Sequence, residues 1–202
     1  MVYTGTMATL EFFYDFVSPY SYLASTRVEA EVAHVGGTVR FRPFLLGGVF
    51  NATGNKAPIE VAAKGPYLAS DCLRWARRLG VPFAWPAKFP VLTVLPLRAA
   101  FAAERAGQLV PYTHALFRAY WAEGRDISDA AVVQDAATRA GLDGAALVAA
   151  APGFKDALKA QTQEAVDRGS FGAPTFFVGQ ELFIGNDRLD FAVEALADAG
   201  AA

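Results

Sequence analysis

The sequence is poor in the residues that usually carry redox and metal chemistry. Its 202 residues include one cysteine, Cys72, and two histidines, His34 and His114. A single cysteine excludes an intrachain disulfide, a redox-active cysteine pair and a thiolate metal cluster. Two isolated histidines give no metal-ligand pattern. We therefore expect no bound metal, and we expect Cys72 to be a small packed side chain in a helix.

Charge clusters, long apolar runs and a targeting segment are also lacking. The 18 Lys and Arg residues nearly balance 20 Asp and Glu residues, and no cluster of like sign stands out. Nucleic acid and membranes are therefore not expected partners. No uninterrupted apolar run reaches about 18 residues, and the N-terminus lacks the basic and apolar segments of a signal peptide. We expect a soluble cytoplasmic protein, with Met7 as an alternative start to Met1.

What the sequence does have begins with a β-α-β pattern, in a globular composition that is 53 % hydrophobic and 13 % aromatic. Residues 9–16, TLEFFYDF, are β-branched and aromatic and predict a short buried strand. Ser18 and Pro19 then offer an N-cap hydroxyl and a proline at the first position of one helix, which a glycine pair ends. Residues 38–46 alternate as a second strand would, so we expect two parallel strands.

The middle of the chain predicts an inserted helical segment, and the end returns to the sheet. Helices are predicted near 64–79, 96–107, 111–123, 129–140 and 155–168. The strands TFFV and ELFI follow around a Gly179-Gln180 turn, and a helix near 187–198 closes the chain. This order predicts an α/β thioredoxin-like fold, β-α-β and later α-β-β-α, with a large all-α insertion. The thioredoxin-like domain would span 8–47 and 152–200, and the inserted helical domain 48–151.

The segment Ser18-Pro19-Tyr20-Ser21 has the frame of a redox-active C-P-Y-C motif in which hydroxyls replace both sulfurs. At a strand-to-helix junction, the Ser18 hydroxyl lies near the free N–H groups of the first helical turn, where the helix dipole favours an anion. The alternative is that Ser18 is only an N-cap. A purely structural role is favoured more strongly for Ser21, one turn into the helix.

The pair Ala173-Pro174 stands directly before an apolar strand. Proline is uncommon there unless its peptide bond is cis and the strand is entered through a turn. A cis proline exposes the backbone of its predecessor, which can then pair with an extended thiol peptide. An ordinary trans proline that blocks the sheet edge is the alternative.

Residues 185–188, Gly-Asn-Asp-Arg, open the final helix. Asn186 and Asp187 are good N-cap residues, which explains the segment as a helix start. An aspartate can also bind the ammonium of a γ-glutamyl group, while neighbouring backbone N–H groups donate to its carboxylate.

Residues 47–58, GGVFNATGNKAP, predict a loop between the second strand and the helical segment. Asn51, Asn55 and Lys56 are its hydrogen-bond donors. The loop is either an ordinary connector or a lid over a ligand.

The resemblance of the chain to a known family rests on five segments that occur in order from about residue 10 to 195. They are FYDFVSPYSYLA, LLGGVFNATGNKAP, AKGPYLASD, FGAPTFFVG and FIGNDRLDF. Together they resemble the 2-hydroxychromene-2-carboxylate isomerases, which belong with the kappa-class glutathione transferases in the DsbA-like branch of the thioredoxin superfamily. The resemblance implies glutathione as the cofactor, bound between the thioredoxin-like face and the helical insertion. It also implies a homodimer and a small aromatic-derived substrate.

The resemblance implies roles for individual residues. Ser18, the catalytic residue, would donate its hydroxyl to the glutathione sulfur and hold it as a thiolate. Ala173 would pair its backbone with the cysteinyl part of glutathione. Further glutathione contacts would come from Asn55, Ile184, Gly185, Asn186 and Asp187. Substrate contacts, matched by position only, would come from Phe50, Asn51 and Phe89.

The reaction that this resemblance implies is a cis–trans isomerisation by reversible thiolate addition to a conjugated enone. It would convert 2-hydroxychromene-2-carboxylate, or a related ring-fission hemiketal, to trans-o-hydroxybenzylidenepyruvate in the degradation of aromatic compounds. A cysteine at position 18 would be a liability, because it could form a mixed disulfide with the thiol that it should activate. Two alternatives stay open: a kappa-like glutathione transferase or peroxidase, and a non-catalytic DsbA-like protein that binds thiol peptides.

Overall fold

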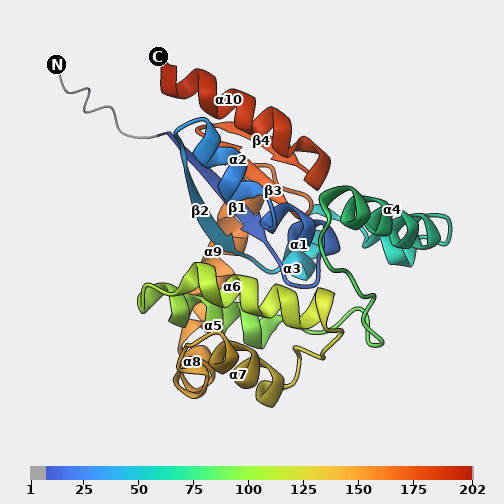
Figure 1. Ribbon diagram of the computed structural model, residues 1–202, viewed down its shortest axis with the longest axis vertical. Helices are drawn as coiled ribbons and strands as arrows, with labels where there is room; N and C mark the ends of the chain where they lie inside the picture. Colours follow the sequence, from blue (N-terminus) through green and yellow to red (C-terminus); the bar gives the residue numbers. More distant parts are fainter. Residues whose placement is uncertain (1–7, 202) are drawn as a thin grey trace.

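The centre of the protein is a four-stranded mixed sheet with the strand order β2-β1-β3-β4. The computed structural model describes residues 8–201 (Figure 1), so the choice between Met1 and Met7 as the start lies outside the described residues. The strands are β1 (Thr9–Tyr14), β2 (Thr38–Pro43), β3 (Thr175–Val178) and β4 (Glu181–Ile184). β1 is parallel to β2, whereas β3 is antiparallel to both β1 and β4. The predicted thioredoxin-like topology and the predicted β3–β4 hairpin are confirmed.

Helices surround the sheet and form a separate group at one end of it. In Figure 1, α5 to α8 gather at the lower end, α10 lies along the upper end and α4 projects to the right. The α-helices are α1 (Pro19–Ser25), α2 (Val28–His34), α3 (Leu46–Thr53), α4 (Lys64–Leu79), α5 (Val94–Arg105), α6 (Leu109–Phe117), α7 (Ala130–Arg139), α8 (Gly144–Ala150), α9 (Lys155–Asp167) and α10 (Leu189–Ala201). Shorter segments are the 3-10 turns η1 (Pro58–Glu60), η3 (Ala151–Phe154) and η4 (Asn186–Arg188) and the π-helical η2 (Arg118–Ala122), which extends α6.

Both faces of the sheet are buried, which explains the nearly continuous apolar sequence of β1. Successive side chains of a strand point to opposite faces. Leu10, Phe12 and Tyr14 enter the main core together with residues of α2 and α10. Phe13 points to the other face, where it packs with Val49 of α3 and with α9.

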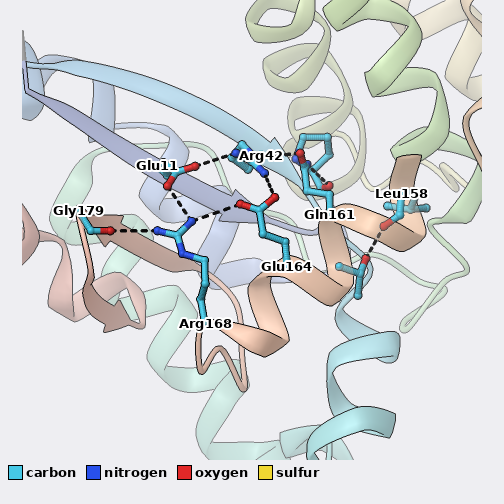
Figure 2. A network of polar contacts seen from close by, with 9 residues as sticks. Glu11, Arg42, Leu158, Gln161, Glu164, Arg168 and Gly179 are labelled. Carbon is cyan, nitrogen blue, oxygen red and sulfur yellow. Dashed lines mark hydrogen bonds and ion pairs between the residues drawn. The ribbon is translucent and has the colours of Figure 1, made fainter. Parts of the chain in front are cut away.

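A network of charged side chains joins α9 to the sheet (Figure 2). Glu11 of β1 accepts hydrogen bonds from Arg42 of β2 and Arg168, each at 2.7 Å. Glu164 of α9 contacts both arginines, and Arg168 also donates to the Gly179 carbonyl at 3.1 Å. The Arg42 side chain is only 7 % exposed. Burial makes this network sensitive to the loss of a partner, because an uncompensated buried charge is costly.

The prediction that residues 47–58 form a loop was wrong for the first half of the segment, which is the helix α3. Its two glycines disfavour a helix, but contacts from distant residues stabilise one. The first N–H group, that of Leu46, donates to the Asp15 carboxylate at 2.8 Å, and Val49 is fully buried. A Cβ added at Gly48 would lie 3.1 Å from a methyl of Thr162, so this close approach favours glycine.

The single helix predicted after Pro19 is two helices, α1 and α2, with a break between them. Near the break, the hydroxyls of Ser25 and Thr26 donate to carbonyl oxygens three residues earlier, each at 2.7 Å. Such bonds compete with the regular backbone pattern of a helix. The helix of residues 144–150, α8, was also not predicted.

Candidate functional site

Ser18 and Ala173 meet where β1 leads into α1 and where β3 begins. Ser18 is the N-cap of α1, and its hydroxyl oxygen accepts the N–H of Ser21 at 3.1 Å. The same hydroxyl donates to the Ala173 carbonyl at 3.1 Å. The Ala173-Pro174 bond is cis, the alternative that allows peptide pairing. Two residues that are 155 positions apart, and that the sequence singled out separately, are therefore in direct contact.

Helix α1 is shorter than the sequence suggested, with seven residues. Few aligned peptide dipoles add up in so short a helix, so its contribution to stabilising an anion is limited. The Ser18 hydroxyl is a hydrogen-bond donor at this junction, where its hydrogen goes to the Ala173 carbonyl.

The segment from Ile184 to Asp187 lies beside the cis proline. The Gly185 N–H donates to the Pro174 carbonyl at 2.9 Å, and the φ angle of Gly185 is 110°, a value that favours glycine. Asn186 is 1 % exposed, and neither polar atom of its side chain has a partner among the described residues. Asp187 is exposed, and its carboxylate lies 3.5 Å from the guanidinium of Arg188. This turn offers polar groups next to the Ser18–Ala173 contact.

Asn55 also contacts the segment that leads to Ala173 and Pro174. Its side-chain amide donates to the Phe171 carbonyl at 2.8 Å, and its side-chain oxygen accepts the Lys56 N–H at 2.8 Å. The segment after α3 therefore lies against the residues that lead to Ala173.

The three predicted substrate residues are less closely associated with Ser18. Phe50 is half-buried and Asn51 exposed on α3. The Phe89 ring lies 5.0 Å from that of Trp85 and 5.7 Å from that of Trp121, measured between centroids. Within residues 8–201, no hydrogen bond or ring contact joins these three residues to Ser18, so their role stays a prediction.

Asp15 has a role at this site that the sequence interpretation missed. Its carboxylate accepts the N–H groups of Val17 at 3.1 Å and Leu46 at 2.8 Å, and it is 1 % exposed. Burial raises the pKa of Asp15 to about 6. One carboxylate thus fixes both the loop before Ser18 and the start of α3. The signal in the sequence was a single acidic residue at the end of an apolar strand.

Tyr20 links α1 to α4. Its hydroxyl donates to Asp71 at 2.8 Å. The next residue, Cys72, is fully buried, and burial raises the pKa of its thiol to about 12. A neutral buried thiol is a poor nucleophile, so the prediction of a packed structural cysteine is confirmed.

A surface hollow of about 380 Å³ lies between α6 and α7, away from these residues. Its charged lining includes Arg118 and Arg139, both of which contact Glu123 at 3.1 and 3.0 Å. The arginines are therefore already paired within the protein, and none of the predicted site residues lines the hollow.

Over residues 8–201, the structure has no group of three or more His, Cys, Asp or Glu side chains that could hold a metal ion. In the same range, no helix is both long and apolar enough to cross a membrane.

The fold and the Ser18–Ala173 contact define a class of protein that comparison with known proteins identifies. Residues 9–197 match the family model described as DSBA-like thioredoxin domain, so this is a DsbA-like thioredoxin-fold protein. The chain belongs, within that class, to the 2-hydroxychromene-2-carboxylate isomerase family, which confirms the predicted resemblance.

Three relatives illustrate the match. The chain is 35 % identical to 2-hydroxychromene-2-carboxylate isomerase of Sphingobium xenophagum over 195 residues, 94 % of this chain and 98 % of the relative. A solved structure of such an isomerase has a TM-score of 0.83 and 29 % identity, with 95 % of each chain covered. Human glutathione S-transferase kappa 1 is 28 % identical over 94 % of this chain and 91 % of its own. These homologues support an enzyme with isomerase function that acts on a small molecule.

Proposed function

We propose that the protein is a glutathione-dependent isomerase that converts 2-hydroxychromene-2-carboxylate, or a related ring-fission hemiketal, to trans-o-hydroxybenzylidenepyruvate. The observation that carries the proposal is the hydrogen bond from Ser18 to the Ala173 carbonyl beside a cis proline. The segment Ser18-Pro19-Tyr20-Ser21 has the frame of a C-P-Y-C motif but no sulfur of its own, so thiol chemistry at this site needs a thiol from a ligand. Membership of the isomerase family supports the proposed reaction.

The polar groups around Ser18 fit the chemistry of glutathione. A tripeptide thiol needs a donor for its sulfur, a backbone partner for its cysteinyl unit and polar groups for its charged γ-glutamyl end. Ser18, Ala173 and the turn from Gly185 to Asp187 can meet these needs in that order. The buried, unpartnered amide of Asn186 supports the fit, because a buried polar side chain normally has a hydrogen-bond partner.

The Ser18 hydroxyl has one hydrogen to donate, and in this structure Ala173 accepts it. We propose that the hydroxyl turns to donate to the ligand sulfur, which frees the Ala173 carbonyl to accept an N–H group of the tripeptide. One internal hydrogen bond would be replaced by two bonds to the ligand. A donor to the sulfur lowers the pKa of a thiol from its ordinary value of about 8.5 and raises the thiolate fraction near neutral pH.

When bound, glutathione supplies a thiol whose reversible addition to a conjugated enone lets the former double bond rotate before the thiol is released. The role of the chain would be to orient the thiol and the substrate. Asn55 would contact the tripeptide from the segment after α3. Phe50, Asn51 and Phe89 would contact the substrate.

The remaining expectations belong to the same proposal. Glutathione would bind between the thioredoxin-like part, 8–47 and 152–200, and the inserted helices of 48–151. The enzyme would act as a cytoplasmic homodimer in the degradation of aromatic compounds. The glutathione position, the homodimer and the place in aromatic degradation rest on the resemblance to the isomerase family, whereas the domain bounds and the cytoplasmic location rest on the sequence pattern.

A kappa-like transferase or peroxidase is the second candidate, favoured by the similarity to human glutathione S-transferase kappa 1. It would use the same Ser18 hydroxyl and the same thiolate on a different electrophile. A non-catalytic thiol-peptide binding protein is the third, and it predicts affinity for peptides without glutathione-linked turnover.

The deciding experiment mixes the protein with 2-hydroxychromene-2-carboxylate, with and without glutathione, and follows the formation of trans-o-hydroxybenzylidenepyruvate. We expect a rate that depends on glutathione. Absence of any such rate would overturn the proposed isomerase. Greater activity on a chlorinated aromatic or on cumene hydroperoxide than on the chromene would favour the transferase or peroxidase.

A further inference from the structure

Arg27 lies at the break between α1 and α2, against the turn η4 that precedes α10. It is the N-cap residue of α2, and its side chain is 13 % exposed. Because the helix is interrupted here, the side chain leaves the α1–α2 junction and reaches the final segment of the fold, 159 residues away in sequence.

The guanidinium of Arg27 binds acceptors on separate elements. One nitrogen donates to the Asn186 carbonyl of η4 at 2.6 Å. A second nitrogen donates to Asp190 of α10 at 2.7 Å and to Glu31 of α2 at 2.8 Å, and the third, Nε, is buried without a partner among the described residues. The Trp75 ring of α4 lies 5.7 Å from the guanidinium carbon. The planar guanidinium, whose donor directions are fixed, thus contacts α2, η4, α10 and α4 at the place where these elements meet.

The bond to Asn186 controls the orientation of a backbone group in η4. The peptide unit that joins Asn186 to Asp187 is planar, and in the trans form its C=O and N–H point in opposite directions. Fixing the Asn186 carbonyl therefore fixes the N–H of Asp187. That N–H belongs to the first turn of η4, where N–H groups have no partner within the helix.

The surroundings of Arg27 indicate that it positions the backbone of η4 and does not attract a ligand by its charge. Its two carboxylate partners, Glu31 and Asp190, already compensate the positive charge. The carbonyl of Asn186 also accepts the N–H of Leu189, so Arg27 adds a second, charge-assisted bond to an acceptor that η4 itself uses.

We propose that Arg27 is the positioning residue that holds the Asn186–Asp187 turn in the conformation that receives the charged γ-glutamyl end of glutathione. This inference rests on the proposed function and deepens it, because it names a residue that the family motifs did not include. Arg27 itself contacts neither sulfur nor substrate.

The test compares Arg27→Met and Arg27→Lys with a matched control, Glu31→Gln. The control removes the charge of one Arg27 partner but leaves the bond to Asn186 in place. Isothermal titration measures the Kd of glutathione, steady-state kinetics give KM for glutathione and kcat at saturation, and hydrogen exchange reports the amides of residues 185–189.

We expect Arg27→Met to raise the Kd and KM for glutathione about tenfold, since it removes a charge-assisted hydrogen bond. Its kcat at saturating glutathione should stay within about twofold of the parent, and amides 185–189 should exchange faster. The Kd of Arg27→Lys should lie between those of the parent and Arg27→Met, because an ammonium group is a point charge without the fixed donor directions of a guanidinium. Glu31→Gln should resemble the parent.

Unchanged glutathione affinity in both Arg27 variants would overturn the inference, and so would an equal loss in Glu31→Gln. The lysine variant keeps the test decisive if the methionine variant fails to fold. A parent protein that binds glutathione but does not isomerise the chromene would overturn the proposed reaction. The Kd values of glutathione for the parent and the Arg27 variants would still test the role of Arg27. A parent that does not bind glutathione would overturn both.

Discussion

The Ser18 hydroxyl donates a 3.1 Å hydrogen bond to the carbonyl oxygen of Ala173, although 155 residues separate the two in sequence. The contact joins the start of α1 to the residue before the cis proline. It places a hydroxyl donor beside a backbone acceptor at the position where a C-P-Y-C protein would present its sulfur.

Ser18→Ala should slow turnover and leave glutathione affinity largely intact. The variant loses the proposed donor to the glutathione sulfur but keeps the backbone of Ala173 and the η4 turn. A hydrogen bond to a charged group contributes about 1.5–3 kcal/mol, so kcat should fall roughly 10- to 150-fold. Steady-state kinetics with the chromene substrate, together with titration of glutathione, measure the two effects separately.

Ser21→Ala is the matched control for this substitution. Ser21 is fully buried one turn later, and its hydroxyl has no partner among the described residues. Its loss should leave kcat within about twofold of the parent, because it touches neither the sulfur site nor Ala173. Equal losses in the two serine variants, or an unchanged rate in Ser18→Ala, would contradict the proposed catalytic role of Ser18.

Ser18→Cys should convert the site into a trap for glutathione. A cysteine sulfur at this junction can attack glutathione disulfide and form a mixed disulfide. Intact-mass measurement after incubation with oxidised glutathione should show one added glutathione that dithiothreitol removes. The parent protein is its control, and an unmodified Ser18→Cys variant would contradict the proposal that glutathione sulfur binds beside residue 18.

Much of the framework could be predicted because its signals are local. The apolar run of β1 and the Gly179-Gln180 turn specify a strand and a hairpin without help from distant residues. The cis form of Pro174 was one of two alternatives, since the sequence does not show which groups surround that bond. The structure shows that Ser18 lies beside this bond and donates to the Ala173 carbonyl.

What could not be predicted depends on contacts between distant residues. Helix α3 contains two glycines, and its formation depends on the Asp15 carboxylate and on burial of Val49. Arg27 carries no motif, and its importance appears only when the end of the chain folds back to place Asn186 against it. A pair of hydroxyl residues, Ser25 and Thr26, was a local sign of the helix break that the sequence interpretation passed over.

Cys72 should resist thiol reagents in the native protein. It is fully buried, and burial raises its pKa to about 12, so very little thiolate exists at neutral pH. Labelling with a maleimide followed by mass measurement should give no adduct in native buffer and one adduct in urea. Rapid native labelling would reopen a redox role for this cysteine.

Asp15 should make the protein more stable as the pH falls from about 6 to 4. Burial raises its pKa from 3.8 to about 6, so in this window the folded state binds a proton that the unfolded state releases. The free energy of unfolding of the parent relative to Asp15→Asn should therefore increase on acidification by up to about 3 kcal/mol. Urea unfolding at pH 7 and pH 4 measures the difference.

Asp126 provides a control of opposite sign for this pH dependence. Hydrogen bonds from Lys88 and Ser128 lower its pKa, so its contribution to stability is present at neutral pH and is lost as the pH falls through the lowered pKa. The advantage of the parent over Asp126→Asn should thus shrink on acidification. If the two comparisons change in the same direction, the buried Asp15 carboxyl is not the source of the effect.

Arg42→Met should destabilise the fold by about 3 kcal/mol, because it leaves Glu11 and Glu164 without one of their cations. Both carboxylates retain Arg168, and Glu164 is 42 % exposed, which limits the loss. Arg139→Met is the control: Arg139 is 57 % exposed beside Glu123, and an exposed ion pair contributes less than about 1 kcal/mol. Urea unfolding of both variants at neutral pH makes the comparison. Equal losses would mean that the network in Figure 2 contributes no more than an ordinary surface ion pair, and that α9 is held by its apolar contacts and by the hydrogen bonds between Gln161 and Pro43 and between Thr162 and Leu45.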